Sequence, residues 1–230
     1  MADRVRYHVD ESVATITMDD GKVNALSPDM QREIQEALDH AELEGVQAVV
    51  LGGNNRVFSA GFDLEVLTKG GDGAIEMLAG GFELAARLLA FPKPIVMACT
   101  GHAIAMGSFL LLSGDHLIGA QSHRIVANEV AIGLTLPYAA LAIMRHRLTP
   151  AAVQRAATLS HEFKGESALD AGYLDELVEA DLVRSRAQEV AQRFTALDAR
   201  AHKDTKLRAR KEVLDGIRTG IALEFRQEGR

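Results

Sequence analysis

The stretch GHAIAMGSFLLLSGD, residues 101–115, starts with small residues and runs into an unbroken apolar block. Its first part predicts a chain turn after a buried strand, and the rest predicts a buried helix that begins near Met106 or Gly107. The first N–H groups of such a helix have no acceptor within the helix and are partly positive, so they can bind a developing oxyanion. Taken alone, the stretch is also typical of a buried helix with a tight entry and no chemical role.

A second stretch, VFSAGFDL at residues 57–64, has the same layout. A short apolar segment ends in small residues, and a helical pattern resumes at Phe62-Asp63-Leu64. Gly61 allows a tight turn there and lets a ligand approach the backbone closely. The two turns lie about 45 residues apart, and the pair is more specific than either turn alone.

Strands and helices alternate around these two stretches. Ser27 as N-cap and Pro28 at the first helical position predict a helix that Gly45 ends. The alternation predicts an α/β core over residues 1–181, and the charged helical pattern beyond it predicts a C-terminal extension over residues 182–230. The predicted strands are 5–9, 13–18, 46–51, 95–98, 116–120 and 124–127.

The composition is that of an ordinary globular protein, since the 230 residues are 47% hydrophobic and 25% charged. The net charge of −7 argues against nucleic acid or an anionic membrane surface as the main partner. The single cysteine, Cys99, cannot form an intrachain disulfide, which fits a reducing compartment. The N-terminus lacks the apolar core of a signal peptide and no apolar run is long enough to span a membrane, so we expect a cytoplasmic protein.

Four segments resemble the enoyl-CoA hydratase/isomerase (crotonase) family and occur in the order found in that family. They are GKVNALS (21–27), FSAGFDL (58–64), GHAIAMGSFLLLSGD (101–115) and FKGESALDAGYLDELV (163–178), and the resemblance covers roughly residues 5–183. It implies a spiral of repeated ββα units and an acyl-CoA thioester as substrate. It also implies no metal, no cofactor beyond the CoA of the substrate, and assembly as a homotrimer or a hexamer.

The resemblance further implies where the substrate binds. In the family, two backbone N–H groups bind the thioester oxygen as it becomes an enolate, and the matching residues here are Phe62 and Met106. Loss of one such donor typically slows a reaction about 100- to 1000-fold. The two lysines implied in CoA binding also fit patterns typical of solvated lysines. All implied contacts with substrate or CoA are Lys22, Val23, Ala25, Ala60, Gly61, Asp63, Leu64, Ile104, Phe109 and Lys206.

Phe109 stands where hydratases of this family have their first catalytic glutamate. The second glutamate of the family lies 20 residues further on, and that position here is Glu129. Hydration uses both carboxylates, whereas the 3,2-enoyl-CoA isomerases of the family keep only the second. One glutamate in an apolar pocket, with a raised pKa, suits a proton shuttle. We therefore predict isomerisation with Glu129 as the single acid and base.

Several alternatives stay open at this point. The chain is an enoyl-CoA hydratase despite Phe109, or it binds acyl-CoA with little turnover, which the bulky apolar run after residue 133 also suits. Glu129 is alternatively a structural glutamate. His102 is interpreted as a packed or hydrogen-bonded histidine, and Asp115 as a structural hydrogen-bonding group. The histidine spacing predicts no metal site.

Overall fold

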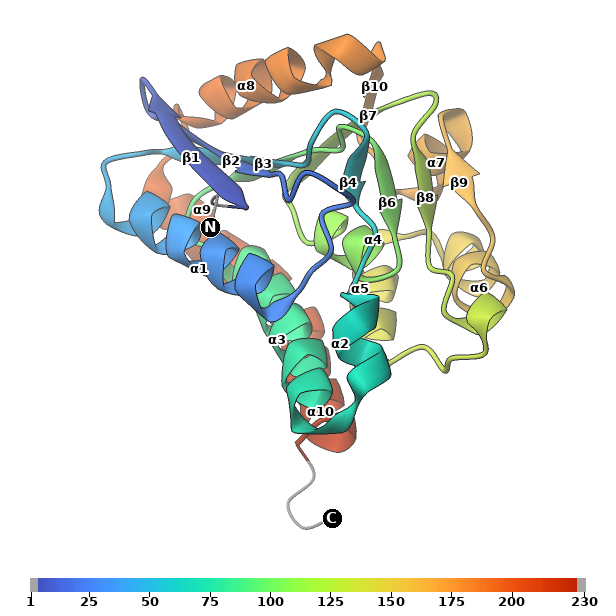
Figure 1. Ribbon diagram of the computed structural model, residues 1–230. Helices are drawn as coiled ribbons and strands as arrows, with labels where there is room; N and C mark the ends of the chain where they lie inside the picture. The colour runs from blue at the N-terminus through green and yellow to red at the C-terminus, as the bar shows by residue number, and fades with distance from the viewer. Residues whose placement is uncertain (1–3, 227–230) are drawn as a thin grey trace.

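A computed structural model describes residues 4–226, and it contains two sheets with helices around them (Figure 1). The strands are β1 (Val5–Asp10), β2 (Val13–Met18), β3 (Ala48–Gly52), β4 (Val57–Ser59), β5 (Ile95–Ala98), β6 (His102–Ile104), β7 (His116–Ala120), β8 (Arg124–Val126), β9 (Phe163–Lys164) and β10 (Glu176–Val178). The α-helices are α1 (Pro28–Leu43), α2 (Leu64–Lys69), α3 (Gly71–Ala90), α4 (Met106–Leu111), α5 (Tyr138–Arg147), α6 (Pro150–Leu159), α7 (Glu166–Ala171), α8 (Val183–Phe194), α9 (Ala199–Ala209) and α10 (Lys211–Glu224). Two 3₁₀ turns, η1 (Val130–Ile132) and η2 (Ala180–Leu182), complete the fold.

The chain winds as a spiral of ββα units, as the family resemblance implies. The first strands of successive units, β2, β3, β5 and β7, are parallel neighbours in a six-stranded sheet of order β1-β2-β3-β5-β7-β10. The second strands, β4, β6 and β8, are parallel neighbours in a four-stranded sheet of order β4-β6-β8-β9. The predicted α/β class is therefore confirmed.

The strand predictions are right for the long apolar runs and incomplete for the short ones. β5 and β7 have the predicted bounds, and β1 and β2 form the predicted antiparallel hairpin. The segment expected only to turn the chain after Gly101 contains the three-residue strand β6, a correction to the sequence reading. Such a strand is too short to show alternation, and it forms because β4 and β8 flank it.

Helix α1 begins where the sequence predicts. The Ser27 hydroxyl oxygen accepts from the Met30 amide at 3.2 Å, and Pro28 occupies the first turn. The helix ends at Leu43 with Glu44 as its C-cap, which is one residue before Gly45. Its apolar face is fully buried against the core.

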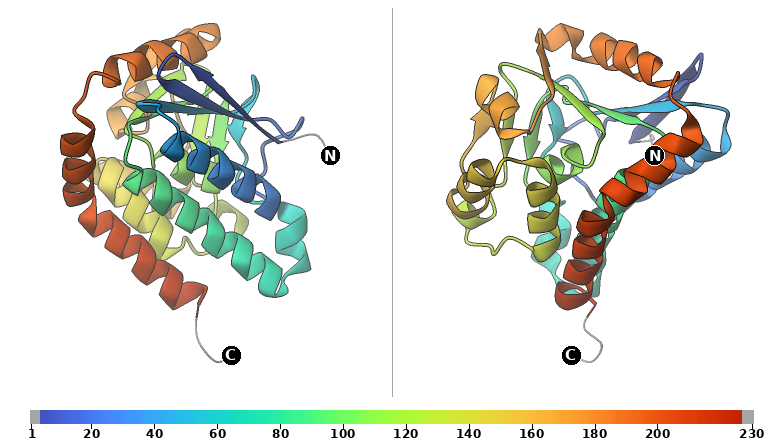
Figure 2. Two further views of the ribbon diagram at one scale, coloured as in Figure 1. Left: turned by 90° about the vertical axis from the view of Figure 1, so that its left-hand side faces the viewer. Right: turned by 180° about the vertical axis from the view of Figure 1, so that it is seen from behind.

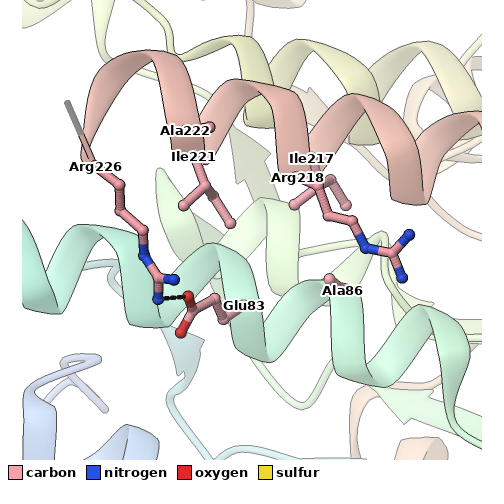
Figure 3. A pocket seen from close by; sticks show the side chains of 7 residues that line it. All are labelled: Glu83, Ala86, Ile217, Arg218, Ile221, Ala222 and Arg226. Carbon is pink, nitrogen blue, oxygen red and sulfur yellow. Dashed lines mark hydrogen bonds and ion pairs between the residues drawn. The ribbon is translucent and has the colours of Figure 1, made fainter. Parts of the chain in front are cut away.

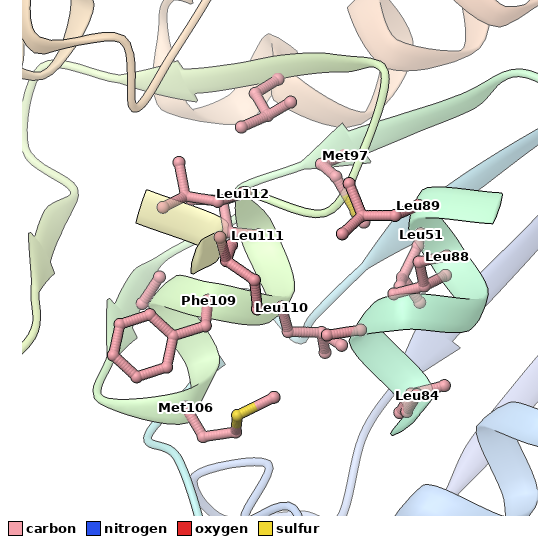
Figure 4. Close-up of a cluster of buried hydrophobic side chains, with 14 of the residues drawn as sticks. Leu51, Leu84, Leu88, Leu89, Met97, Met106, Phe109, Leu110, Leu111 and Leu112 are labelled. Atoms are coloured by element: carbon pink, nitrogen blue, oxygen red, sulfur yellow. The ribbon is translucent and has the colours of Figure 1, made fainter. Parts of the chain in front are cut away.

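The buried helix α4 joins the two sheets to helix α3. The run Leu110–Leu112 is fully buried, and Figure 4 shows these leucines beside Leu88, Leu89 and Met97. The apolar block of the opening stretch is therefore the centre of the core. Its burial fixes the position of the N-terminus of α4.

The three C-terminal helices pack on two sides of the core (Figure 2). Helix α8 covers a face of the six-stranded sheet through Val183, Ala187 and Val190, and α10 lies beside α3 and α5. In the described residues no strand follows β10. The predicted core begins at residue 1 and the predicted C-terminal extension ends at residue 230. Residues 1–3 and 227–230 lie outside the described part of the chain. Within residues 4–226 no helix is both long and apolar enough to cross a bilayer.

A pocket of about 310 Å³ lies between α3 and α10. Figure 3 shows its lining and the ion pair between Arg226 and Glu83 at one end. None of the site residues predicted from the sequence lines it; the lining residues are Glu83, Ala86, Ile217, Arg218, Ile221, Ala222 and Arg226.

Asp115, at the end of the opening stretch, ties the C-terminal helices to the core. Its carboxylate accepts from the Ile95 amide at 2.7 Å, from the Lys206 ammonium at 2.6 Å and from the Arg210 guanidinium at 2.9 Å. The Lys206 side chain is only 4% exposed, and burial lowers its pKa to about 8. Asp115 has the structural role expected for it, and its charge offsets two buried cations.

We predict that Asp115→Asn destabilises the fold by about 3 kcal/mol, because the substitution leaves Lys206 and Arg210 buried without a counter-charge. The measurement is urea unfolding at neutral pH. Asp215→Asn is the matched control, since Asp215 pairs with Lys211 and Arg218 on an exposed surface. Equal stability of the two variants would contradict the assigned role of Asp115.

Candidate active site

The four-stranded sheet brings the three predicted catalytic residues to one edge. Because β4, β6 and β8 are parallel neighbours, their carboxyl ends lie together. Phe62, Met106 and Glu129 follow these strands, each within three residues of the strand end. The carboxyl edge of parallel strands is where ligands bind in open α/β sheets.

The turn after β4 requires glycine at position 61, whose φ is +91°. A Cβ at this position would lie 3.0 Å from the Ala105 Cβ, 3.0 Å from the Ile104 carbonyl oxygen and 3.2 Å from the Met106 nitrogen. The Gly61 turn therefore packs directly on the turn that precedes α4. This contact places the amides of Phe62 and Met106 on neighbouring turns.

The turn before α4 is held in an unusual backbone conformation. Ala105 has φ 49° and ψ −126°, a region that residues with a Cβ rarely adopt. Its amide donates to the Val126 carbonyl oxygen at 2.8 Å, which ties the turn to β8. Met106 is the first residue of α4, so its amide has no acceptor within the helix. In residues 4–226 neither the Met106 amide nor the Phe62 amide donates to a protein acceptor.

Glu129 lies half-buried where β8 leads into η1. Its Oε2 atom is buried and has no hydrogen-bond partner among the described residues. Burial raises the pKa of the carboxyl to about 7, and its own backbone amide acts weakly in the opposite direction. The group can therefore accept or release a proton near neutral pH.

Phe109 lies on α4, one turn after Met106, and is only 1% exposed (Figure 4). Its ring stacks on Phe82 of α3, with centroids 6.3 Å apart, and the Phe62 ring meets Phe82 edge-on at 6.2 Å. The Phe62 ring also occupies the space beside Gly81, where a Cβ would come within 2.4 Å of it. The position of the missing family carboxylate is thus part of an apolar cluster.

A cleft of about 530 Å³ brings together four of the predicted contact residues, Lys22, Val23, Ala25 and Asp63. The rest of its lining comes from several separate segments, so the sequence did not indicate that these residues form one cleft. They are Arg4, Asp20, Ser27, Pro28, Asp29, Glu65, Val66 and Lys69.

Lys22 differs from the other two cations of this cleft. Arg4 pairs with Asp29 at 3.2 Å and Lys69 pairs with Glu65 at 2.9 Å. Lys22 is exposed and forms no ion pair within the described residues. Its ammonium group is therefore free to meet an anionic ligand.

Three further residues predicted to contact the substrate lie near the carboxyl edge of the four-stranded sheet. The Asp63 carboxylate caps α2 by accepting from the Glu65 amide at 2.8 Å and the Val66 amide at 3.3 Å. The Ala60 amide donates to the Val23 carbonyl oxygen at 3.0 Å, which joins the cleft to the Gly61 turn. Leu64 is 71% exposed at the start of α2.

Lys206 and His102, which the sequence analysis considered, both have partners outside the cleft that holds Lys22. Lys206 is buried against Asp115 and does not line the cleft that holds Lys22. His102 accepts the Arg124 amide through Nδ1 at 3.1 Å, as expected of a hydrogen-bonded histidine. Neither side chain is included in the site that we propose below.

Comparison with known proteins gives a consistent assignment of the fold. A family model described as enoyl-CoA hydratase/isomerase matches residues 8–226. The apo structure of an enoyl-CoA isomerase from Mtb superposes with a TM-score of 0.95 at 56% sequence identity, covering 98% of this chain and 100% of that chain. The crotonase-like spiral implied by the four sequence segments is thereby confirmed.

Two curated relatives carry the name of a different reaction. A probable enoyl-CoA hydratase of Mycobacterium avium (strain 104) is 31% identical over 210 residues, which cover 90% of this chain and 80% of that protein. A probable enoyl-CoA hydratase of Bacillus subtilis (strain 168) is 29% identical over 167 residues, 71% of this chain, and the match covers 65% of its own length. The family match extends over nearly the whole described chain, and the protein belongs to the enoyl-CoA hydratase/isomerase family.

Proposed function

We propose that the protein isomerises 3-enoyl-CoA thioesters to 2-enoyl-CoA thioesters with Glu129 as its single acid and base. The observation that carries this proposal is the half-buried Glu129 carboxyl, whose buried Oε2 atom has no hydrogen-bond partner in the described residues and whose pKa is raised by burial to about 7. It lies at the same sheet edge as the Phe62 and Met106 amides. The 56%-identical Mtb relative is named an enoyl-CoA isomerase in one structure and a probable enoyl-CoA hydratase in another, so its names are compatible with this choice and do not decide it.

The two amides supply the electrostatic part of the mechanism. In this proposal the thioester oxygen accepts from both N–H groups, and the negative charge that develops on it is stabilised as C2 loses a proton. The Gly61 turn and the Ala105 turn hold the two donors rigidly before the reaction starts. Such preorganised donors stabilise the transition state more than the ground state.

Glu129 moves the proton in two steps. Its carboxylate removes a proton from C2, and the C–H electron pair moves into a dienolate whose charge rests on the thioester oxygen. The resulting carboxylic acid then protonates C4, while the double bond forms between C2 and C3. Glu129 ends as a carboxylate and the substrate keeps its atomic composition. A pKa near the working pH suits both half-steps.

Phe109 disfavours the competing reaction. Hydration needs a nucleophilic water held and deprotonated near C3, and a ring in an apolar cluster cannot accept its proton. The rival enoyl-CoA hydratase function is supported by the names of the mycobacterial and Bacillus relatives. A non-catalytic acyl-CoA-binding function is the remaining rival.

The cleft with the free Lys22 is the proposed binding site of the CoA moiety. Lys22 would pair with a CoA phosphate, while Val23 and Ala25 would contact the rest of the CoA through the short segment that lines the cleft. Ala60, Leu64 and Ile104 complete the proposed contacts near the thioester. We further propose a homotrimer or hexamer, a cytoplasmic location, and no cofactor apart from the CoA of the substrate.

Product analysis with purified protein tests the reaction directly. We expect 3-enoyl-CoA to give a 2-enoyl-CoA of the same mass, and Glu129→Gln to slow this about 100- to 10,000-fold because the acid and base are lost. CoA-ester binding should persist in the variant. Glu166→Gln, an exposed glutamate on α7, is the matched control. Full isomerase activity of Glu129→Gln would contradict the proposal. Formation of a product heavier by one water from 2-enoyl-CoA would favour the hydratase function.

The pH dependence of kcat/KM follows from the Glu129 pKa. The base must be ionised in the free enzyme, so kcat/KM should be low below about pH 7, rise as the pH passes through about 7, and level off above it. The measurement is a pH profile at low substrate concentration. A midpoint at the ordinary glutamate value of 4.5 would show that Glu129 is not the base or is not desolvated.

Phe109→Glu restores the second carboxylate of the hydratases. We expect this variant to gain water addition to 2-enoyl-CoA, since a second proton acceptor then faces the site. Phe109→Gln, which has a similar size and no charge, is the control for loss of the aromatic ring. Thermal unfolding identifies variants that fail to fold. A folded Phe109→Glu variant with no more hydration than Phe109→Gln would show that Phe109 does not decide between the two reactions.

A further inference from the structure

The C-terminal end of α10 is seated on the start of α5. A Cβ at Gly220 would lie only 2.6 Å from the Ala139 amide nitrogen, so the two backbones are in close contact. One turn further on, the Glu224 carboxylate accepts from the Tyr138 amide at 2.9 Å. Tyr138 is the first residue of α5, so its amide has no acceptor within its own helix. These two contacts give the end of α10 a defined position.

The next two residues of the chain contact α3. The Phe225 ring stacks on the Phe82 ring, with centroids 6.0 Å apart and an angle of 10° between the planes. The Arg226 guanidinium pairs with Glu83, the residue after Phe82 (Figure 3). Phe225 is half-buried, whereas Phe82 is only 1% exposed. Phe225 therefore forms part of the outer cover of a buried ring.

The side chains of both proposed oxyanion donors pack against α3 at Gly81 and Phe82. The Phe62 ring meets the Phe82 ring edge-on at 6.2 Å. A Cβ at Gly81 would lie 2.4 Å from the Phe62 ring and 3.6 Å from the Met106 Cε atom. The segment of α3 that Phe225 covers is therefore the segment that supports the two donors from behind.

These contacts form a continuous path from α10 to the proposed site. Protein interiors are close-packed, and they transmit a local displacement rather than absorb it. Loss of the Phe225 ring removes one of the contacts that define where Phe82 lies. A shift of Phe82 toward the vacated space would let the Phe62 ring follow, and the direction of the Phe62 amide would change with it.

We propose that Phe225 is a positioning residue for the oxyanion site. Its ring holds Phe82, and Phe82 holds the Phe62 ring, so the Phe62 amide keeps its direction relative to the Met106 amide. The inference rests on the proposed role of these two amides. Phe225 acts through other residues and does not itself touch the thioester.

A role limited to packing would give a different result. Phe225→Ala removes buried apolar surface, so it should lower Tm whether or not the ring positions Phe62. Only the positioning role predicts a change at the oxygen of a bound thioester. Phe194→Ala is the matched control, because Phe194 is also half-buried on a C-terminal helix, α8. Its ring meets His116 of the six-stranded sheet edge-on at 6.0 Å, outside the proposed site.

Infrared difference spectroscopy measures the oxyanion site without turnover. The ligand is butanoyl-CoA with an isotope-labelled thioester carbonyl, which is saturated and has no double bond to move. In the unmodified protein we expect the carbonyl stretching frequency to lie below its value in water, because two fixed N–H groups donate to the oxygen. Phe225→Ala should lose part of this lowering. Phe194→Ala should keep it, as should Phe225→Tyr, which retains the ring.

Kinetics with 3-enoyl-CoA supply the second readout. In Phe225→Ala we expect kcat to fall about tenfold while KM changes by less than about twofold, because a misdirected donor stabilises the transition state less and affects binding little. Phe225→Leu keeps much of the apolar volume without the flat ring. It should show the same two changes with a smaller fall in Tm, so it tests the proposal if Phe225→Ala does not fold.

The outcomes separate this inference from the proposed function. An unchanged carbonyl frequency in a folded Phe225→Ala or Phe225→Leu variant, or an equal loss in Phe194→Ala, overturns the role of Phe225 even in an active isomerase. A reduced lowering in a protein that turns over no 3-enoyl-CoA supports the positioning role and refutes the isomerase proposal. No lowering in the unmodified protein refutes the assignment of the two amides, and the inference with it.

Discussion

The parallel pairing of β4, β6 and β8 is the constraint on which the rest of the site depends. Each strand is only three residues long, so the pairing is maintained by what packs around it. The buried leucines of α4 and the contact of Gly61 with the Ala105 turn both lie just after the carboxyl ends of β6 and β4, and together they hold these ends in place. Three chain segments far apart in the sequence thereby present two amides and one carboxylate at a single edge.

The chemistry of the edge follows from how little charge it contains. Phe109 and Phe82 form an apolar surface where a second carboxylate would otherwise lie. Burial raises the pKa of Glu129 to about 7, and no cation in the described structure contributes a compensating effect. In a more polar site the same glutamate would stay ionised and would be a poorer proton donor.

Local sequence patterns predicted much of this arrangement, and their failures have physical causes. Ser27 with Pro28, and the apolar runs of β5 and β7, are local signals that the fold preserves. Strand β6 is defined by its neighbours, so its own small residues resemble a turn. Lys206 resembles a CoA-binding lysine in sequence, yet Asp115, 91 positions away, determines its environment.

Phe62 contributes to the structure through both its backbone amide and its side-chain ring. Its amide lies at the edge that we propose to be reactive, while its ring packs on Phe82 and occupies the space beside Gly81. A side chain at Gly81, on the buried side of α3, would displace the Phe62 ring and tilt the Phe62 amide with it. In the proposed site, the packing of the hydrophobic interior therefore affects the position of an oxyanion-binding amide through this residue.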